Sequence, residues 1–143
     1  MWTETVKILK SRYRVDLLPP TDPESIENVI KNLELGDEFK DLYNATNGLT
    51  LDWFRVLPIR DESNIKRTWD SLEKANNSET SKFELTEEFL KRFVAFAEVG
   101  FKECALYDKS DGSIWYEEGN EFHKTDLSLE EFVELCLKEV TEL

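Results

Sequence analysis

The side chains that could do chemistry are few in this sequence, and they form no motif. The only histidine, His123, lies in a charged stretch and lacks the His or Cys partner that a zinc site needs. Nothing around it indicates general acid–base work, and the sequence holds no GxSxG elbow, P-loop, GxGxxG turn or EF-hand loop. We therefore expect no catalytic residue, no metal and no cofactor. An uncharacterised hydrolase is the catalytic alternative.

The two cysteines, Cys104 and Cys136, each lie among apolar residues. A free thiol in such surroundings behaves as a small apolar side chain. No CxxC spacing indicates metal binding or redox work. We expect both thiols to be buried and reduced, with a disulfide or a reactive thiol as the alternative.

Three pairs of adjacent glutamates, at 87–88, 117–118 and 130–131, resemble catalytic acid–base pairs only at first sight. Adjacent residues do not face each other on a helix, and on a strand they point to opposite faces. Glutamates at 130–131 instead suit the first turn of a helix, where the helix dipole favours acids. None of the three pairs is expected to be an acid–base pair.

The carboxylates between residues 108 and 121 are a better candidate for binding. Lys109 is the only cation within that stretch, and the acids are expected at one end of a hairpin. Trp115 is the aromatic residue most suited to an interface, because it neighbours Tyr116 on a strand and one of the two must face away from the core. Simple solvation of a charged loop tip is the alternative. The residues expected to bind a partner are Asp108, Asp111, Trp115, Glu117, Glu118 and Glu121.

Net charge is the strongest signal in the composition. The 143 residues carry 31 acidic and 18 basic side chains, a net charge of −13, and residues 72–143 carry 18 of the acids and 8 of the bases. Such a chain lacks the cations that bind phosphates, so nucleic acid and anionic membrane are not expected partners. The acidic surface either keeps the protein soluble or steers it toward a basic protein partner.

The length predicts one domain over residues 1–143, with the N-terminal helical segment 1–18 as part of it. The sequence shows neither an apolar run of about 18 residues nor the apolar block of a secretory signal. We therefore expect a cytoplasmic protein. Its oligomeric state is left open, because no heptad seam is present.

Apolar spacing and turn residues predict an α+β domain in which a mainly antiparallel β-sheet packs against helices. Within the segment 64–74 the spacing predicts a helix with Ile65, Trp69 and Leu72 facing inward. Ser128 and Glu131 form the pattern of a capping box that opens the last helix. The other predicted elements are helices over 1–13, from Pro23 to Gly36, from 37–38 to Asn47-Gly48 and over 87–91, and strands over 49–59, 93–98, 103–108 and 113–118, the last two joined by a turn at 109–112.

The order of these elements resembles the SUKH superfamily, also called the Smi/Knr family, from about Pro19 to Val140. The chain departs from the family pattern at two places. Leu35-Gly36-Asp37 stands where members carry a leucine–proline pair, and the segment from Val99 to Glu103 keeps a single glycine where members often carry an Asp/Gly-rich turn. The residues that carry the resemblance are Pro19-Pro20, Leu35-Gly36, Phe39, Leu42, Asn47-Gly48, Trp53, 93–98, Asp111-Gly112 and 129–132.

The resemblance implies a small α+β domain without enzymatic activity. Bacterial members act as immunity proteins (antitoxins) that bind and neutralise a cognate toxin domain, often a nuclease, and fungal members resemble regulators of cell-wall assembly. We expect an immunity protein whose partner is a basic toxin domain encoded nearby. A regulatory scaffold that binds another cellular protein is the alternative.

Overall fold

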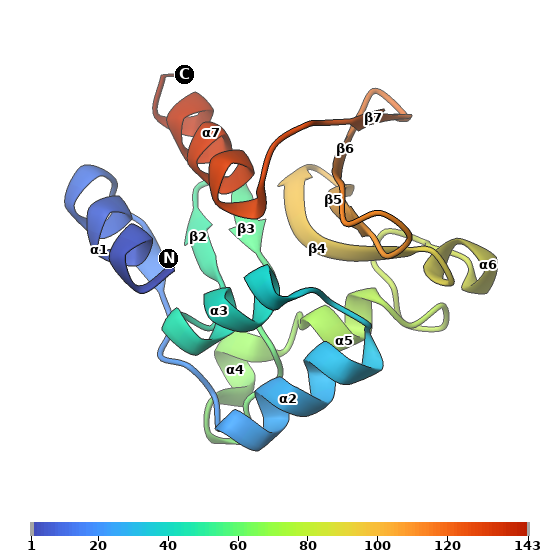
Figure 1. Cartoon of the computed structure of the whole chain (residues 1–143), viewed down its shortest axis with the longest axis horizontal. Coiled ribbons are helices and arrows are strands. Elements are labelled where there is room, and N and C mark those ends of the chain that lie inside the picture. Colours follow the sequence, from blue (N-terminus) through green and yellow to red (C-terminus); the bar gives the residue numbers. More distant parts are fainter. Residues whose placement is uncertain (1, 143) are drawn as a thin grey trace.

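The computed structural model describes residues 2–142, so the expected helix start at Met1 and the last residue of the expected domain lie outside the described residues. These residues fold into a single α+β domain with one antiparallel sheet, as the sequence predicts (Figure 1). Each strand pairs with the next one along the chain. The strands are β1 (Asp16–Leu17), β2 (Leu49–Leu51), β3 (Phe54–Val56), β4 (Phe93–Gly100), β5 (Glu103–Asp108), β6 (Ile114–Glu118) and β7 (Glu121–Lys124).

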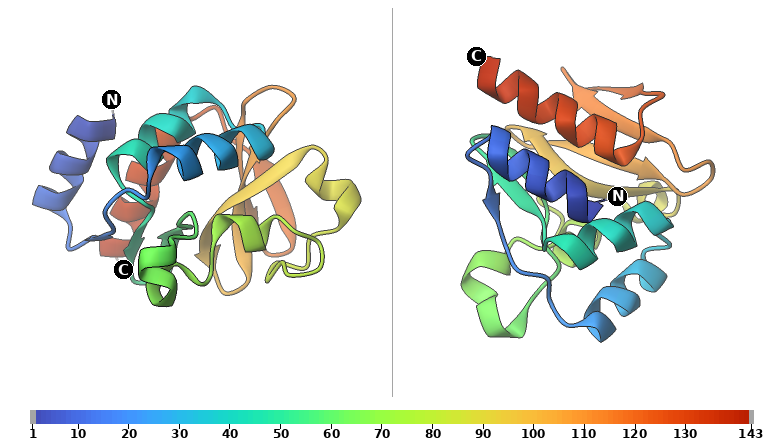
Figure 2. Two further views of the ribbon diagram at one scale, coloured as in Figure 1. Left: turned by 90° about the horizontal axis from the view of Figure 1, so that it is seen from below. Right: turned by 60° about the vertical axis from the view of Figure 1, so that its left-hand side comes forward.

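Helices cover the sheet. Helix α1 contacts α3 and α7, and α2 packs on α3, so these four helices form a layer over one face of the sheet (Figure 2). The short helices α5 and α6 instead contact β4. The helices are α1 (Trp2–Arg12), α2 (Pro23–Asn32), α3 (Asp37–Ala45), α4 (Ile65–Thr68) after a 3-10 turn η1 (Glu62–Asn64), α5 (Leu72–Ala75), α6 (Glu87–Leu90) and α7 (Leu129–Glu142).

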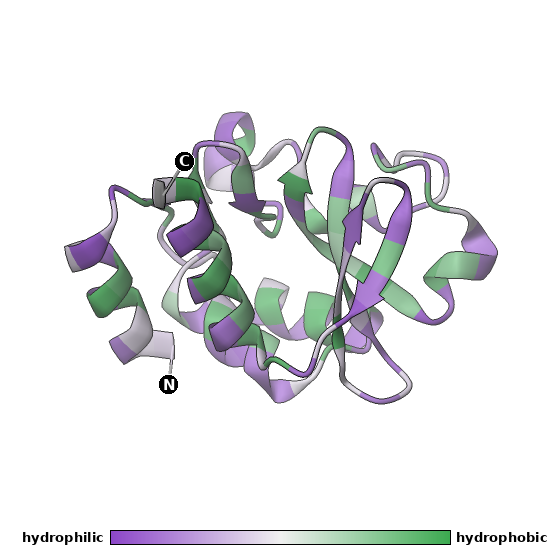
Figure 3. Cartoon of the chain, turned by 90° about the horizontal axis from the view of Figure 1, so that it is seen from above, coloured by the Kyte–Doolittle hydropathy of each residue, from purple (hydrophilic) through white to green (hydrophobic). Residues whose placement is uncertain are grey.

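The helix starts follow the capping signals in the sequence. Asp22 accepts a hydrogen bond from the Ser25 backbone N–H (2.9 Å) ahead of α2. At the start of α7, the Ser128 hydroxyl accepts from the Glu131 N–H (3.2 Å) and the Glu131 carboxylate accepts from the Ser128 N–H (2.9 Å), which confirms the capping box. Along α7, apolar residues then alternate with polar ones and turn one side of the helix to the core (Figure 3).

The main core lies between the sheet and the layer of α1, α2, α3 and α7. Its centre is aromatic: the Phe96 ring on β4 meets Phe39 of α3 at 5.2 Å and Phe132 of α7 at 6.0 Å between ring centroids. A register shift in the β4–β5 pairing falls between Ala95 and Ala97. This β-bulge lets Phe96 and Ala97 both join the main core, although neighbours on a regular strand face opposite sides.

A second, smaller apolar cluster covers the other face of the sheet. It is built on Ala95, Cys104 and Leu106 of β4 and β5, with Leu85 and the rings of Phe89 and Phe93 packed around them. Cys104 and Cys136 are buried free thiols, as predicted.

The Asn47-Gly48 pair does more than end α3. The Asn47 side chain donates to the Ile59 carbonyl (2.9 Å) and accepts from the Ile59 N–H (2.8 Å), so it ties the end of α3 to the segment that follows β3. Gly48 has φ +79°, and a Cβ there would lie 2.4 Å from the Val56 carbonyl oxygen. Only glycine fits this position.

Two sequence predictions were wrong. The single helix over 64–74 is interrupted, because the Ser71 hydroxyl accepts from the Lys74 N–H and opens the separate helix α5. Thr68 therefore points inward and Trp69 does not: the Trp69 side chain is 61% exposed, with the Lys74 ammonium 3.8 Å from its ring centre. The second error is that two strands were not predicted. Strand β1 has only two residues, and the Glu-Phe-His-Lys sequence of β7 reads as a charged stretch although it pairs with β6.

Candidate protein-binding site at the hairpin end of the sheet

Three hairpin turns meet at one end of the sheet. They join β2 to β3, β4 to β5 and β6 to β7, and the antiparallel register places them together, because Arg55 of β3 pairs with Glu98 near the end of β4 and Ala105 of β5 pairs with Tyr116 of β6. Each turn uses left-handed backbone, at Asp52 (φ 51°), Lys102 (φ 57°) and Asn120 (φ 69°). We call this region the hairpin end and define it as residues 52–53, 101–103 and 117–121.

The hairpin end exposes two aromatic side chains. Phe101, in the β4–β5 turn, is 89% exposed, and Trp53, in the β2–β3 turn, is 39% exposed. Large apolar side chains at turn tips are not needed for the core, and aromatic side chains are enriched in protein interfaces. The two residues are therefore candidates for contact with a partner.

Two acids of the hairpin end are held by backbone groups rather than by cations. Glu103 accepts from the Gly119 N–H (3.0 Å), and Glu117 accepts from the Cys104 N–H (3.2 Å). Within residues 2–142, no lysine or arginine forms an ion pair with Glu103, Glu117, Glu118 or Glu121. Lys102 is the one basic residue of the hairpin end and forms no ion pair within the described part of the chain, so this end keeps a net negative charge.

Some acids outside the hairpin end are paired with bases. Glu98, two residues before the end of β4, pairs with Lys82 (2.8 Å), and the same ammonium binds Asp70 (2.6 Å). Arg55 on β3 also binds Asp70 (2.9 Å). This network balances two acids with two bases, which the hairpin end does not.

A groove of about 270 Å³ lies between the hairpin end and α7. Its apolar walls come from both sides, with Trp53 and Tyr116 on the sheet and the 44% exposed Leu135 on α7. None of the residues that line it is basic. The full lining is Trp53, Val99, Glu103, Tyr116, Glu117, Glu118, Thr125, Leu127, Phe132, Leu135, Cys136 and Glu139.

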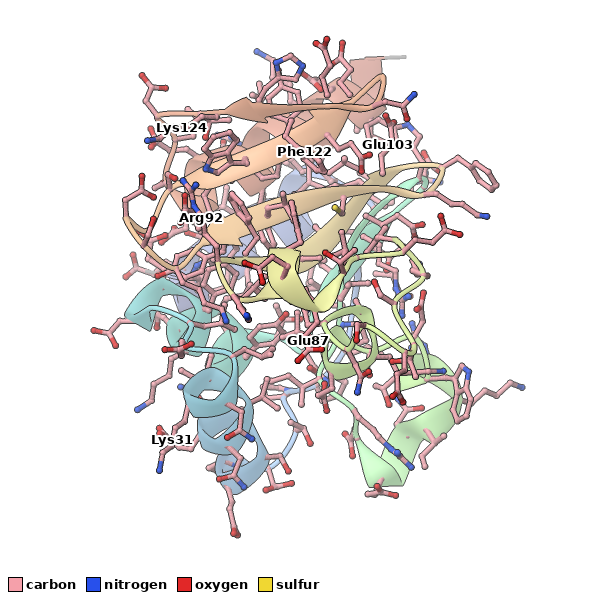
Figure 4. All side chains as sticks on the ribbon, turned by 90° about the vertical axis from the view of Figure 1, so that its right-hand side faces the viewer. Lys31, Glu87, Arg92, Glu103, Phe122 and Lys124 are labelled. Carbon is pink, nitrogen blue, oxygen red and sulfur yellow. The ribbon has the colours of Figure 1, made fainter. Side chains whose placement is uncertain are left out.

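The six residues that the sequence singled out do not lie together. Strand β6 separates Asp108 and Asp111, near the turn 109–112, from Glu117, Glu118 and Glu121. Five strand residues span about 17 Å. Figure 4 shows the separation, with Arg92 and Lys124 at one end of the sheet and Glu103 at the other. The expectation of one acidic cluster was wrong, because a hairpin places its two turns at opposite ends of the shared strand.

Asp108 is buried in an ion pair instead of facing solvent. Its side chain is fully buried and accepts from the Arg92 guanidinium (2.7 and 3.1 Å) and from the N–H and hydroxyl of Ser110 (2.9 and 2.6 Å). Burial alone would raise the pKa of Asp108, but these hydrogen bonds outweigh it and the pKa is lowered. The carboxylate stays charged and fixes the turn that follows β5.

Asp111 is exposed but neutralised. It accepts from the N–H and hydroxyl of Ser113 (2.9 and 2.6 Å) and pairs with Lys124 (2.9 Å). The bonds from Ser113, followed by those from Lys124, hold the pKa of Asp111 far below its usual range. Lys124 comes from β7, the strand that the sequence did not reveal, so its contribution could not be anticipated.

Trp115 lies on the face of the sheet opposite the groove. Its ring packs on Phe93 at 5.7 Å, and its indole N–H donates to the Ser113 hydroxyl (2.9 Å). The prediction that Trp115 and Tyr116 face different layers is confirmed, because Tyr116 packs on the main core. Of the six residues, Glu117 and Glu118 line the groove and Glu121 lies beside it, in the hairpin end.

Sequence reasoning missed Trp53, Phe101, Glu103, Leu135 and Glu139 as site residues. Leu135 and Glu139 are four apart on α7 and therefore share a helix face, which is a readable signal. The others come together only through the pairing of strands that are distant in sequence. No local pattern carries that information.

Catalytic features are sparse in the described residues. His123 stacks on Tyr116 at 5.2 Å and forms no hydrogen bond to a serine or cysteine within 2–142. No group of three or more His, Cys, Asp or Glu side chains among the described residues is placed to hold a metal ion. Burial raises the pKa of the Cys136 thiol to about 12, which leaves it protonated at neutral pH.

The hairpin end and the adjoining groove thus combine exposed aromatic side chains with carboxylates that form no ion pair in the described chain. None of the helices in the described part of the chain is long and apolar enough to cross a membrane. Comparison of the chain with family models, with curated proteins and with solved structures finds no match.

Proposed function

We propose that this protein is a non-enzymatic, cytoplasmic immunity protein that binds a basic toxin domain, such as a nuclease of a polymorphic toxin system, and thereby neutralises it. The observation that carries the proposal is the hairpin end, where Glu103, Glu118 and Glu121 lie beside exposed Trp53 and Phe101 without a basic partner among the described residues. The SUKH resemblance supplies the functional class, and it depends on sequence pattern alone.

The physical case for neutralisation follows from charge. A nuclease binds the phosphate backbone through Lys and Arg, so its cleft is basic. An acidic surface of complementary shape can occupy that cleft, and charge complementarity raises the association rate and selects the partner. A few buried aromatic anchors supply most of the binding energy in such interfaces. An inhibitor of this kind needs no catalytic group.

The first experiment is affinity capture of the tagged protein from its native host, at low and at high salt, with identification of bound proteins by mass spectrometry. The proposal expects one dominant, stoichiometric, basic partner encoded next to this gene, whose capture weakens at high salt. A set of unrelated housekeeping proteins would overturn the proposal in favour of a regulatory scaffold.

A growth assay then tests neutralisation directly. Co-expression of the wild-type protein with the neighbouring gene is expected to rescue growth, and the triple variant E103Q/E118Q/E121Q is expected to lose most of the rescue. The matched control E24Q/E79Q/E87Q removes the same charge from exposed positions outside the hairpin end. Equal rescue by both triple variants would exclude the hairpin end from the interface.

A further inference from the structure

We infer that the groove between α7 and the hairpin end binds one long basic side chain, Lys or Arg, which the protein partner inserts as an anchor. The inference deepens the proposed function and rests on it for the identity of the partner, but the pocket can be tested without that partner. It starts from the composition of the walls, which combine apolar surface with carboxylates and contain no base.

The two walls are built from different elements. On α7, Leu135 and Glu139 lie four residues apart on one helix face. On the sheet, Glu103 and Glu118 each lie two residues beyond the Ala105–Tyr116 pair, so they flank each other on the face that carries Tyr116. The groove therefore has carboxylates on both sides and apolar surface between them.

The two sheet glutamates are like charges at opposite positions of neighbouring strands. Like charges on neighbouring strands destabilise a sheet, and no Lys or Arg within residues 2–142 pairs with Glu103 or Glu118. A cation placed between them relieves the repulsion. Binding of a cation at this point therefore stabilises the fold as well as the complex.

The apolar walls select the kind of cation. Val99, Leu135 and the aromatic Trp53 offer nothing to a hydrated metal ion, and no cluster of metal-binding side chains exists in the described chain. A Lys or Arg side chain has an apolar stem with a charged head and covers apolar surface while its head meets carboxylates. The aromatic ring of Trp53, which lines the groove, adds attraction for the cation. The chemistry thus matches an amphipathic cation better than an inorganic one.

The test uses two blocked tripeptides, acetyl-Gly-Arg-Gly-amide and the same peptide with citrulline, which is close in shape to Arg but uncharged. Titration into the ¹⁵N-labelled full chain is followed by NMR. Saturable shifts are expected for the Trp53 indole N–H and the amides of Glu118, Leu135 and Glu139 with the arginine peptide alone. The dissociation constant is expected in the millimolar range, as befits a single anchor.

Matched variants localise the effect. E118Q/E139Q is expected to weaken arginine-peptide binding at least five-fold, whereas E24Q/E79Q, which removes the same charge at exposed positions outside the groove, changes it less than two-fold. L135A is expected to weaken binding without altering net charge. Shifts spread evenly over the acidic surface, equal binding of the citrulline peptide, or equal loss in both double variants would each overturn the inference.

The inference and the proposed function fail in different ways. Peptide binding in the groove with no toxin partner in the capture experiment refutes the immunity role and leaves the pocket standing. A captured basic toxin that binds E118Q/E139Q and L135A as tightly as wild type refutes the groove as its anchor site and leaves the immunity role standing.

Discussion

Replacement of Asp108 by asparagine tests whether this acid is structural or belongs to an interface. The carboxylate is fully buried and accepts four hydrogen bonds, two from Arg92 and two from Ser110. An asparagine side chain offers one acceptor oxygen and turns an NH₂ group toward donors, so two of the bonds become donor–donor contacts. Breaking a buried ion pair costs about 3–5 kcal/mol. Because Arg92 is 55% exposed and regains water, we expect about 2–4 kcal/mol for D108N.

Urea unfolding at pH 7 measures this loss. With a denaturant dependence of about 1–3 kcal/mol per molar urea, the midpoint of D108N is expected about 1–2 M below that of wild type. The exposed variant E121Q is the control and is expected within about 0.5 kcal/mol of wild type. Since Asp108 is the last residue of β5, at the end of the sheet away from the groove, the folded D108N protein is expected to bind the arginine peptide with unchanged affinity.

The pH dependence of the free energy of unfolding gives an independent check that the charged Asp108 carboxylate stabilises the fold. The folded-state pKa of Asp108 lies below the ordinary 3.8, because hydrogen bonds from Arg92 and Ser110 outweigh the opposing effect of burial. A carboxylate with a lowered pKa stabilises the fold at pH values above its unfolded pKa, about 3.9, and loses that contribution as the pH falls through the folded pKa. The stability difference between wild type and D108N is therefore expected to be constant from about pH 5 to 8 and to shrink below about pH 4. Equal urea midpoints, or a difference that persists undiminished in acid, would refute the structural role.

Three further variants or measurements test the fold. Gly48→Ala places a Cβ 2.4 Å from the Val56 carbonyl at φ +79°, so we expect a loss of about 3 kcal/mol or more in thermal unfolding, and a loss under about 1 kcal/mol would contradict the close approach. Trp69→Ala is expected to cost less than about 1 kcal/mol by the same measurement, because the ring is 61% exposed; a core-sized loss would restore the original prediction. Cys104 and Cys136 are buried and burial raises both pKa values, that of Cys136 to about 12, so a thiol-specific disulfide reagent is expected to react slowly in the native state and with both thiols in urea. Fast native labelling of either thiol would show that its burial is not maintained in solution.

Short-range signals in the sequence predicted the elements well. The Ser128–Glu131 capping box, Pro23 at the start of α2 and the Gly112 turn each depend on residues within one turn of chain. The capping and turn interactions at these positions form between residues close in sequence, so the sequence alone determines them. The α+β class follows from the same signals and is confirmed.

The misses share a different cause. Ser71 can lie within a helix or cap the next one. In the structure it caps α5, and the Leu72 N–H donates to the carbonyl of Pro58 (2.8 Å), a residue distant in sequence. Strand β7 has no apolar alternation of its own and forms because β6 offers an edge beside it. Both outcomes are set by contacts far apart in sequence. Propensity within the segment could not reveal them.

The candidate site shows the same limit. Closeness in sequence suggested that the acids of 108–121 act together, whereas the register of β5, β6 and β7 sends Asp108 and Asp111 to one end of the sheet and Glu118 and Glu121 to the other. Conversely, Trp53, Glu103 and Glu139 converge from three separate parts of the chain. A site made by strand register becomes visible only when the register is known.

The hairpin end combines negative charge with exposed aromatic side chains. Solubility requires a net charge, but it does not require that charge to gather, and exposed aromatic residues oppose it. In this protein the acids near Arg55 and Lys82 are paired, and Asp108 and Asp111 are also paired, each with a base from a neighbouring strand or turn. The carboxylates of the hairpin end are left without such partners in the described chain, next to Trp53 and the 89% exposed Phe101. Exposed aromatic side chains beside unpaired carboxylates and a groove are the features that the proposed binding of a basic partner requires.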